Sequence, residues 1–296
     1  MKNDMLSICI PIYNYDIRQL FYSLIKQKST LTIPIEIVLA DDGSDSSYKA
    51  INEEIASLAD VYLKMDKNVG RAKIRNVLSD NTQYDYLLFM DCDSVIVSNT
   101  FLSDYVAQMD GKEKIVYGGV CYSDNASWNE KLRYLYGLKR ECRSLEFRNA
   151  HPYQTFLSGN FLIYKKVFEK VRFDETLIAY GYEDALFSWA VYQNGIPIRH
   201  INNPLGNRLV SNKCFLKQCS TAVRNLSYMV NNGNFPQNVR LVKIYNKMKS
   251  LQIANLCAYI GYVINPLIYA LLYLNVPFLS LLDAYKLNLF CRYMKS

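Results

Sequence analysis

The chain has 296 residues, 50% of them apolar and 21% charged, which gives enough hydrophobic material for a substantial core and excludes a disordered chain. The 34 Lys and Arg outnumber the 27 Asp and Glu, for a formal net charge of +7. This surplus favours anionic partners such as nucleotides or acidic lipid surfaces, and we expect no nucleic acid partner. The eight cysteines form no CxxC pair, so we expect reduced, mostly buried thiols and no zinc site.

Short runs rich in β-branched and aromatic residues alternate with amphipathic helical patterns from residue 6 to about residue 120. This alternation predicts an α/β fold with a Rossmann-like, largely parallel sheet flanked by helices. In such sheets ligands bind beyond the carboxyl ends of the strands, so the residues that follow each strand are the first candidates for a site. The expected strands are 6–12, 35–40, 61–65, 86–90 and 115–117.

Acidic residues follow two of these strands. Asp41 and Asp42 come at the end of the second strand, and Asp91 and Asp93 follow the fourth. Carboxylates at the ligand edge suit Mg²⁺ or Mn²⁺, which are commonly held by one or two carboxylates together with substrate phosphates. Because Asp-Gly and Asp-x-Asp are also turn signals, each pair taken alone leaves a purely structural role open.

Two predicted helix starts also have residues that could serve in a site. Arg71, Lys73 and Arg75 open the helix after the third strand, where backbone N–H groups and cations can hold phosphate, although a solvated basic helix is the alternative. Glu183 and Asp184 open a later helix and could supply a general base and an acceptor for sugar hydroxyls. Acidic residues in a first turn are also favoured by the helix dipole alone.

The ordered set of motifs is more specific than any one of them. Together they resemble glycosyltransferase family 2, with the GT-A fold, over roughly residues 5–230. Residues 281–287 are similar to the tails of bacterial members of the surface-polysaccharide type. The resemblance implies an inverting, metal-dependent hexosyl- or N-acetylhexosaminyltransferase. It would move a sugar from a nucleotide diphosphate sugar, most readily a UDP-sugar, to a hydroxyl of a glycan or lipid-linked acceptor in cell-surface polysaccharide synthesis. The matching segments are 11–14, 41–44, 68–76, 91–93, 158–160 and 181–184.

The resemblance implies donor contacts at five positions. Asp42 would contact the nucleobase, and Pro11 and Tyr13 would line the pocket for the base and ribose. Arg75 would lie near the nucleotide, and Asp91 would contact the ribose. This set would form the donor half of the site.

The resemblance also implies a metal site for Mn²⁺ or Mg²⁺, with Asp93 as a ligand and Asp91 beside it. Related sequences often have a His shortly after an Asn-Pro pair, and here that place is taken by Asn207. His200 is the nearby histidine and can equally be an ordinary strand residue. The third protein ligand is therefore left open between Asn207 and His200.

For catalysis, the resemblance implies that Asp184 is the base and that Glu183 orients the acceptor, with Gly159 and Asn160 also on the acceptor side. A nucleoside diphosphate leaves with charge that a metal ion can stabilise, so a single base suffices where a glycosidase needs two carboxyl groups. A sugar nucleotidyltransferase and a noncatalytic nucleotide-sugar-binding module are the alternatives. The lack of a Gly-rich, Lys-containing loop after the first strand argues against the former, and the Glu-Asp pair argues against the latter.

The two ends of the chain bear on its location. The apolar run at residues 6–13 is too short for a signal peptide, so we expect the amino-terminal part to stay in the cytoplasm. Residues 250–282 contain no charged residue, and Asn and Pro within them predict two short helices in a membrane interface, with a hairpin packed on protein as the alternative. We thus expect a GT-A domain at 1–235 and a helical, membrane-associating region at 236–296. The expected partner is an anionic membrane surface, and the enzyme would be peripheral at the inner face of the plasma membrane.

Overall fold

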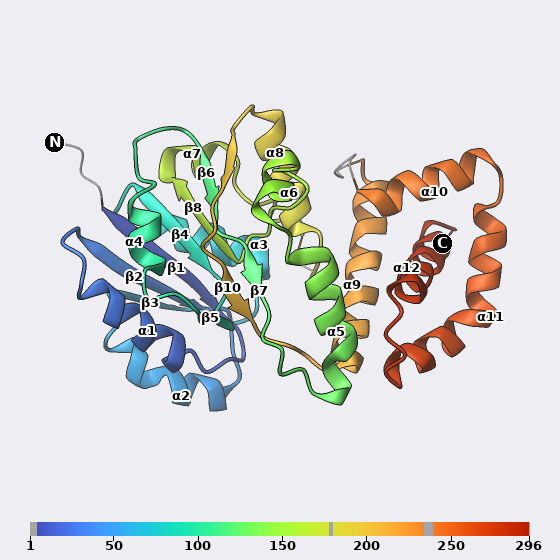
Figure 1. Cartoon of the computed structure of the whole chain (residues 1–296), viewed down its shortest axis with the longest axis horizontal. Helices are drawn as coiled ribbons and strands as arrows, with labels where there is room; N and C mark the ends of the chain where they lie inside the picture. The colour runs from blue at the N-terminus through green and yellow to red at the C-terminus, as the bar shows by residue number, and fades with distance from the viewer. Residues whose placement is uncertain (1–4, 178–179, 234–238, 296) are drawn as a thin grey trace. The chain divides into compact units, whose positions relative to one another are not determined.

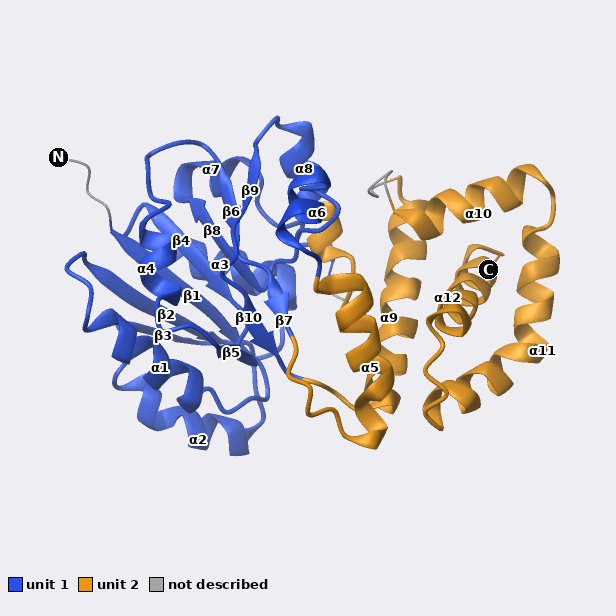
Figure 2. Ribbon diagram, viewed as in Figure 1, with its two compact units in different colours: residues 1–121, 143–178, 187–208 blue, residues 122–142, 179–186, 209–296 orange. Residues whose placement is uncertain are grey.

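The computed structural model describes residues 5–177, 180–233 and 239–295. The chain forms two compact units (Figure 2). The sheet unit comprises residues 1–121, 143–178 and 187–208, and the helical unit comprises residues 122–142, 179–186 and 209–296. Each unit is described by itself below.

The main sheet belongs to the sheet unit (Figure 1). Its strands are β1 (Leu6–Ile12), β2 (Ile35–Asp41), β3 (Val61–Lys64), β4 (Tyr86–Met90), β6 (Ile115–Tyr117), β8 (Asn160–Tyr164) and β9 (Ile198–His200). They are arranged in the order β3-β2-β1-β4-β8-β6-β9. Pairing is parallel from β3 to β4 and between β6 and β9, whereas β8 is antiparallel to both β4 and β6. The predicted mostly parallel, Rossmann-like sheet is confirmed.

Helices cover both faces of this sheet because its central strands are apolar on both sides. Ile8 and Ile10 of β1 belong to one core with α1 (Arg18–Lys28), and Cys9 belongs to the other core with α3 (Arg71–Asp80). Successive strand residues point to opposite faces, so an unbroken apolar run is the pattern of a doubly covered strand. Further helices are α2 (Ser46–Ala56), α4 (Phe101–Val106), α6 (Leu145–Ala150), α7 (Lys165–Lys170) and α8 (Glu183–Gln193), whose first turn belongs to the helical unit.

A second, three-stranded sheet lies in the same unit. Its strands are β5 (Ser94–Ile96), β7 (Val120–Cys121) and β10 (Leu205–Asn207), in the order β5-β10-β7. Strand β10 runs antiparallel to β5, and the register opposes Asn207 to Ser94. Since Ser94 directly follows Asp93, this pairing brings the end of β10 next to the acidic loop after β4.

The helical unit contains α5 (Lys131–Tyr136), α9 (Asn212–Asn231), α10 (Arg240–Ser250), α11 (Ala254–Tyr273) and α12 (Leu279–Lys295), with a 3-10 turn at Trp128–Glu130 and a π turn at Gly137–Glu141. One core joins these helices, with Leu226 of α9, Leu272 of α11 and Phe290 of α12 fully buried. The carboxyl-terminal stretch of this unit begins at residue 209 and includes α9, whereas the sequence predicts a helical region from 236. The expected boundary itself lies outside the described residues.

Helix α11 is continuous, so the prediction of two short helices within residues 250–282 is wrong. The helix passes through Asn265 and Pro266 and ends at Tyr273. The buried Asn265 accepts a hydrogen bond from Nδ2 of Asn288 at 2.9 Å, which satisfies its side chain against α12. Within the described residues, α11 is the one helix long and apolar enough to cross a membrane, a test that the core helix of a bundle can also pass.

Candidate active site

Three neighbouring parallel strands end at one edge of the main sheet, and predicted site residues follow each of them. Tyr13 follows β1, Asp42 follows β2, and Asp91 follows β4, and these strands are adjacent in the order β2-β1-β4. Pro11 is the last residue but one of β1, and the Tyr13 side chain is 50% exposed. The predicted donor residues thus gather at the edge where open α/β sheets bind ligands.

Asp42 fastens the loop before α3 to the end of β2. One of its carboxylate oxygens accepts a hydrogen bond from the backbone N–H of Val69 at 2.6 Å, and the other accepts from Gly70 at 3.2 Å. Burial raises the pKa of Asp42, while these two N–H groups act to lower it. The neighbouring Gly43 is required here, because its φ is +72° and an added Cβ would meet the backbone of Lys67 at 2.5 Å.

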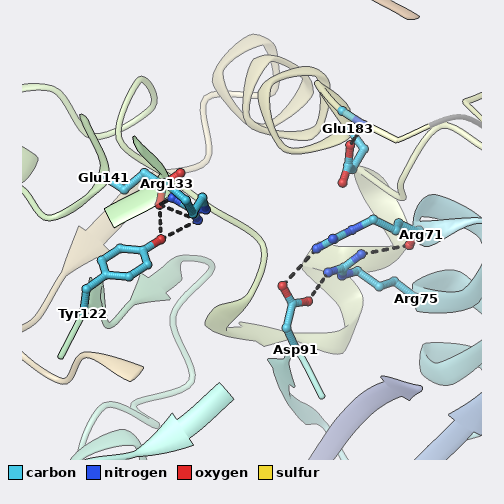
Figure 3. A network of polar contacts seen from close by, with 8 residues as sticks. Arg71, Arg75, Asp91, Tyr122, Arg133, Glu141 and Glu183 are labelled. Carbon is cyan, nitrogen blue, oxygen red and sulfur yellow. Dashed lines mark hydrogen bonds and ion pairs between the residues drawn. The ribbon is translucent and has the colours of Figure 1, made fainter. Parts of the chain in front are cut away.

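Asp91 is held by two arginines of α3, one on each carboxylate oxygen (Figure 3). Nη2 of Arg71 lies 2.9 Å from Oδ2, and Nη2 of Arg75 lies 2.5 Å from Oδ1. Burial is the largest single effect and opposes ionisation of Asp91, yet the two guanidinium groups together hold its pKa below the usual value. Asp91 is therefore a carboxylate fixed in orientation by α3.

Arg75 is 1% exposed and reaches the site only through Asp91. It also donates from Nη1 to the carbonyl oxygen of Arg71 at 2.9 Å, and its guanidinium lies 5.5 Å from the centre of the Phe173 ring. Arg75 is predicted to lie near the nucleotide, and this burial does not fit a direct contact with it. Arg71, whose side chain is 40% exposed, is the arginine of the pair that a ligand can reach.

Gly159 and Asn160 occupy different environments, although the sequence analysis places both on the acceptor side. Gly159 packs on Asp91: an added Cβ would come within 2.8 Å of Asp91 Oδ2. Asn160 is fully buried, and its Nδ2 donates to the carbonyl oxygens of Gly119 and Asn203 at 2.8 and 3.0 Å. Its Oδ1 accepts a hydrogen bond from the Tyr105 hydroxyl at 2.7 Å. This amide holds loops together, and acceptor contact does not fit its position.

The structure distinguishes between the two candidates for a third metal ligand. Asn207 is opposed in register to Ser94, beside Asp93, and is partly exposed. His200 lies on β9, is 4% exposed, and its Nε2 lies 3.0 Å from the carbonyl oxygen of Pro152. The position of Asn207 fits the oxygen-rich edge, whereas His200 is engaged inside the sheet unit.

The predicted catalytic pair belongs to the helical unit, at the start of α8. Glu183 is 5% exposed, and its Oε2 accepts a hydrogen bond from the backbone N–H of Gly181 at 2.8 Å. The carbonyl oxygen of Gly181 accepts from Nδ2 of Asn225 on α9 at 2.7 Å. Asp184 is partly exposed. Glu183 is thus turned back onto its own loop, and Asp184 is the more accessible carboxylate of the two.

A family model matches the amino-terminal part of the chain, which includes the residues at the ends of β1, β2 and β4. The model described as Glycosyl transferase family 2 matches residues 7–172, which is more than half of the chain. The chain belongs to this family. The family and the GT-A-like fold predicted from the motifs are confirmed.

Relatives and solved structures of the family show how far the likeness extends. The chain is 24% identical over 235 residues to chondroitin synthase of Escherichia coli, covering 68% of this chain and 34% of that protein. It is 28% identical over 191 residues to the minor teichoic acid biosynthesis protein GgaA of Bacillus subtilis, covering 62% and 42%. The chain thus spans less than half the length of these curated relatives.

Among solved structures, the mannosyltransferase PcManGT from Pyrobaculum calidifontis, in complex with GDP-Man and Mn²⁺, is similar with a TM-score of 0.54. The sequences are 14% identical, and the match covers 78% of this chain and 65% of that chain. At this identity the likeness shows the fold alone.

Two polar networks, one in each unit, are not evident from the sequence. The sequence predicts Arg71 only as one of three cations at a helix start that can hold phosphate, and its contact with Asp91 is seen only in the structure. In the helical unit, Arg133 is paired with Glu141 at 3.1 Å and hydrogen bonded to the Tyr122 hydroxyl at 2.5 Å (Figure 3). No sequence motif marks this second network, because its members are separated by irregular spacings.

A pH-dependent contribution to stability is expected from His200. Burial, more than the neighbouring Arg148, lowers its pKa to about 4 from the ordinary 6.5. The unfolded chain therefore takes up a proton first as the pH falls, and stability decreases between pH 6.5 and pH 4. Urea unfolding at pH 6.5 and pH 5 should show a loss of about 2 kcal/mol that His200→Gln abolishes. An unchanged pH slope in the variant would contradict this assignment.

A second prediction concerns Gly181. Its φ is +104°, and an added Cβ would meet the Cβ of Ala222 at 2.3 Å. Gly181→Ala should lower the free energy of unfolding by about 2–4 kcal/mol, through left-handed backbone strain and overpacking. Gly195→Ala is the matched control, because φ is +65° there and nothing lies within 4 Å of the added Cβ. Equal losses in the two variants would show that the contact with α9 is unimportant.

Proposed function

We propose that this chain is an inverting glycosyltransferase. It would transfer a hexosyl or N-acetylhexosaminyl group from a nucleotide diphosphate sugar, with UDP-sugars as the favoured donors. The acceptor would be a hydroxyl of a glycan or lipid-linked acceptor in cell-surface polysaccharide synthesis. The observation that carries the proposal is the gathering of Tyr13, Asp42 and Asp91 at the ends of three adjacent parallel strands. Membership of glycosyl transferase family 2 and the likeness to proteins named for chondroitin and teichoic acid synthesis support it.

The donor would lie across this edge of the sheet unit. The exposed Tyr13 ring, with Pro11 beside it, offers an apolar surface for the base and ribose. The carboxylate of Asp42 is fixed by the Val69 and Gly70 amides, so it has a defined orientation for a base N–H. Arg71 is exposed enough to pair with a phosphate oxygen while Arg75 keeps Asp91 in place.

A divalent cation, Mn²⁺ or Mg²⁺, fits the donor atoms at this edge. Asp93 and Asn207 offer oxygen ligands at neighbouring positions, the kind that Mg²⁺ and Mn²⁺ prefer. No group of three His, Cys, Asp or Glu side chains that could hold a metal occurs within the described residues, so substrate phosphates would complete the ligand set. When bound, the cation would stabilise the charge on the departing diphosphate.

Asp184 would remove the proton from the acceptor hydroxyl, which attacks the anomeric carbon from the face opposite the diphosphate. The bond from that carbon to the diphosphate oxygen breaks as the new glycosidic bond forms, so the configuration inverts. Glu183 would position the loop, because it ties the N–H of Gly181 to the start of α8.

We also propose that the helical unit contacts an anionic membrane surface and that the enzyme acts at the inner face of the plasma membrane. Large apolar side chains of α11 are exposed, among them Leu256, Val263 and Leu267 at 57%, 68% and 63%. Exposed apolar area of this extent is typical of a surface that contacts a membrane or a partner.

The activity is tested by a screen of the purified chain against UDP-, GDP- and other nucleotide sugars with Mn²⁺, Mg²⁺ or a chelator. Donor hydrolysis and thermal shift are read together. One donor that is hydrolysed only with metal supports the proposal and identifies the sugar. Pyrophosphate release from a nucleoside triphosphate and a sugar phosphate would favour a nucleotidyltransferase instead, and binding without turnover on any acceptor would favour a noncatalytic module.

A further inference from the structure

The helical unit contains a cavity of about 940 Å³ formed by α9, α11 and α12. None of the predicted donor, metal or catalytic residues lines it. Three cations and several tyrosines do, among them Arg224, Tyr228, Tyr259, Tyr262, Arg292 and Lys295. This volume is typical of a site for a small organic ligand and exceeds what a single phosphate ion requires. We call it the α9/α11/α12 groove.

The groove is strongly cationic. Residues 209–296 contain ten Lys and Arg and one acidic residue, Asp283, whose carboxylate is paired with Arg140 at 2.7 Å. No Asp or Glu lines the groove, and within the described residues neither Arg224 nor Lys295 has an ion-pair partner. The Arg292 guanidinium stacks 3.9 Å from the centre of the Tyr262 ring, which holds it in the wall of the groove. The groove is therefore complementary to an anion.

The same groove is continuous with an apolar surface. Tyr259 and Tyr262 line it and are 68% and 67% exposed. On α11, Tyr259 is three residues from the exposed Leu256 and four from the exposed Val263, so these three side chains share one face. A ligand that fills the groove from this side would have an anionic end at Arg224 and Arg292 and an apolar part along α11.

We propose that the α9/α11/α12 groove binds one molecule of an anionic phospholipid, with its phosphate between Arg224 and Arg292 and its acyl chains along the exposed face of α11. The inference deepens the proposed membrane contact, on which it rests, by assigning a specific lipid site to it. A free anion would leave the apolar face uncovered. The aliphatic side chains of Leu256 and Val263 would offer no hydrogen bond to an acidic glycan, whereas they match the apolar surface of an acyl chain.

The test uses the full chain and a lipid that is monomeric in water, so that membrane binding and site binding are measured separately. Dihexanoylphosphatidylglycerol is titrated below its micelle concentration by calorimetry, with dihexanoylphosphatidylcholine and glycerol phosphate as comparators. We expect one bound phosphatidylglycerol per chain, and at least tenfold weaker binding of both comparators. Equal binding of glycerol phosphate would overturn the lipid assignment, and equal binding of phosphatidylcholine would overturn the role of the cations.

Matched variants locate the site. Arg224→Ala/Arg292→Ala should weaken phosphatidylglycerol binding about 30-fold, because each cation near an anionic lipid contributes about a fivefold gain in affinity. Arg240→Ala removes the same charge from an exposed position on α10 that does not line the groove, and it should change the affinity less than twofold. The single variant Arg224→Ala, at an exposed side chain, should lose about fivefold and serves if the double variant fails to fold. Equal losses in Arg224→Ala and Arg240→Ala would overturn the proposal.

Vesicle flotation separates this site from the proposed membrane contact. Phosphatidylglycerol vesicles that float the chain while the monomeric lipid does not bind would refute the groove and leave the membrane contact standing. Binding of the monomeric lipid without flotation would support the groove and refute the membrane contact. Displacement of the bound lipid by an acidic polysaccharide, at an equal concentration of anionic groups, would show that the groove is a glycan site instead.

Discussion

Replacing Asp184 with Asn is expected to lower sugar transfer about 10²- to 10⁴-fold, the usual contribution of a general base. The amide keeps the size of the side chain and cannot take a proton from the acceptor hydroxyl. The proposed donor residues lie in the sheet unit, whereas Asp184 lies in the helical unit, so donor affinity should stay within about twofold. Transfer is measured with the donor found in the screen, and donor affinity is measured by calorimetry in the presence of the same metal.

Two companion variants sharpen the result. Asp85→Asn makes the same chemical change at an exposed residue before β4, at the opposite end of that strand from the site, and should leave transfer unchanged. Glu183→Gln keeps an oxygen that can accept from the Gly181 N–H, so it should reduce transfer less than Asp184→Asn does. Retained transfer in Asp184→Asn, or a larger loss in Glu183→Gln, would assign the base to another residue.

The strands of the main sheet were predictable because each is a local pattern. The run from Leu6 to Ile12 is apolar at nearly every position, and the structure buries it between two cores. Helix α11 was not predictable from the same kind of reasoning. Asn265 and Pro266 are breakers in isolation, but Asn288 on α12 satisfies the Asn265 amide, and Pro266 lies on the exposed side of the helix. The deciding contact is made by a helix more than twenty residues away.

For the candidate site, the order of the strands in the sequence predicts that Asp42 and Asp91 lie at one edge of the sheet, as they do, since adjacent parallel strands end on the same side. It could not tell which groups these carboxylates bind. That depends on α3, which brings Arg71 and Arg75 to Asp91 from 20 and 16 residues away. Likewise, the burial of His200 follows from the packing of β9, and the sequence gives no sign of it.

Replacing Arg75 with Met is expected to lower the free energy of unfolding by about 3–5 kcal/mol, the cost of breaking a buried ion pair by removing one partner. Arg75 is 1% exposed, and Met keeps much of its length while removing every donor. The Asp91 carboxylate would lose its 2.5 Å contact and keep only the more exposed Arg71. Donor binding should weaken as well, because the orientation of Asp91 is no longer fixed. Urea unfolding and donor calorimetry measure the two effects.

The control is Arg172→Met, which breaks another Arg–Asp pair, at 2.7 Å to Asp80, where both side chains are at least 35% exposed. A surface pair contributes about 0–1 kcal/mol, so the control should lose far less stability than Arg75→Met. Because α3 holds the pKa of Asp91 below its ordinary value, the stabilisation is present above that value and is lost as the pH falls through the folded-state pKa. The difference between the wild type and Arg75→Met should therefore shrink below about pH 4. A difference that is constant down to pH 2 would mean that Arg75 stabilises the fold by packing on Phe173 and not by pairing with Asp91.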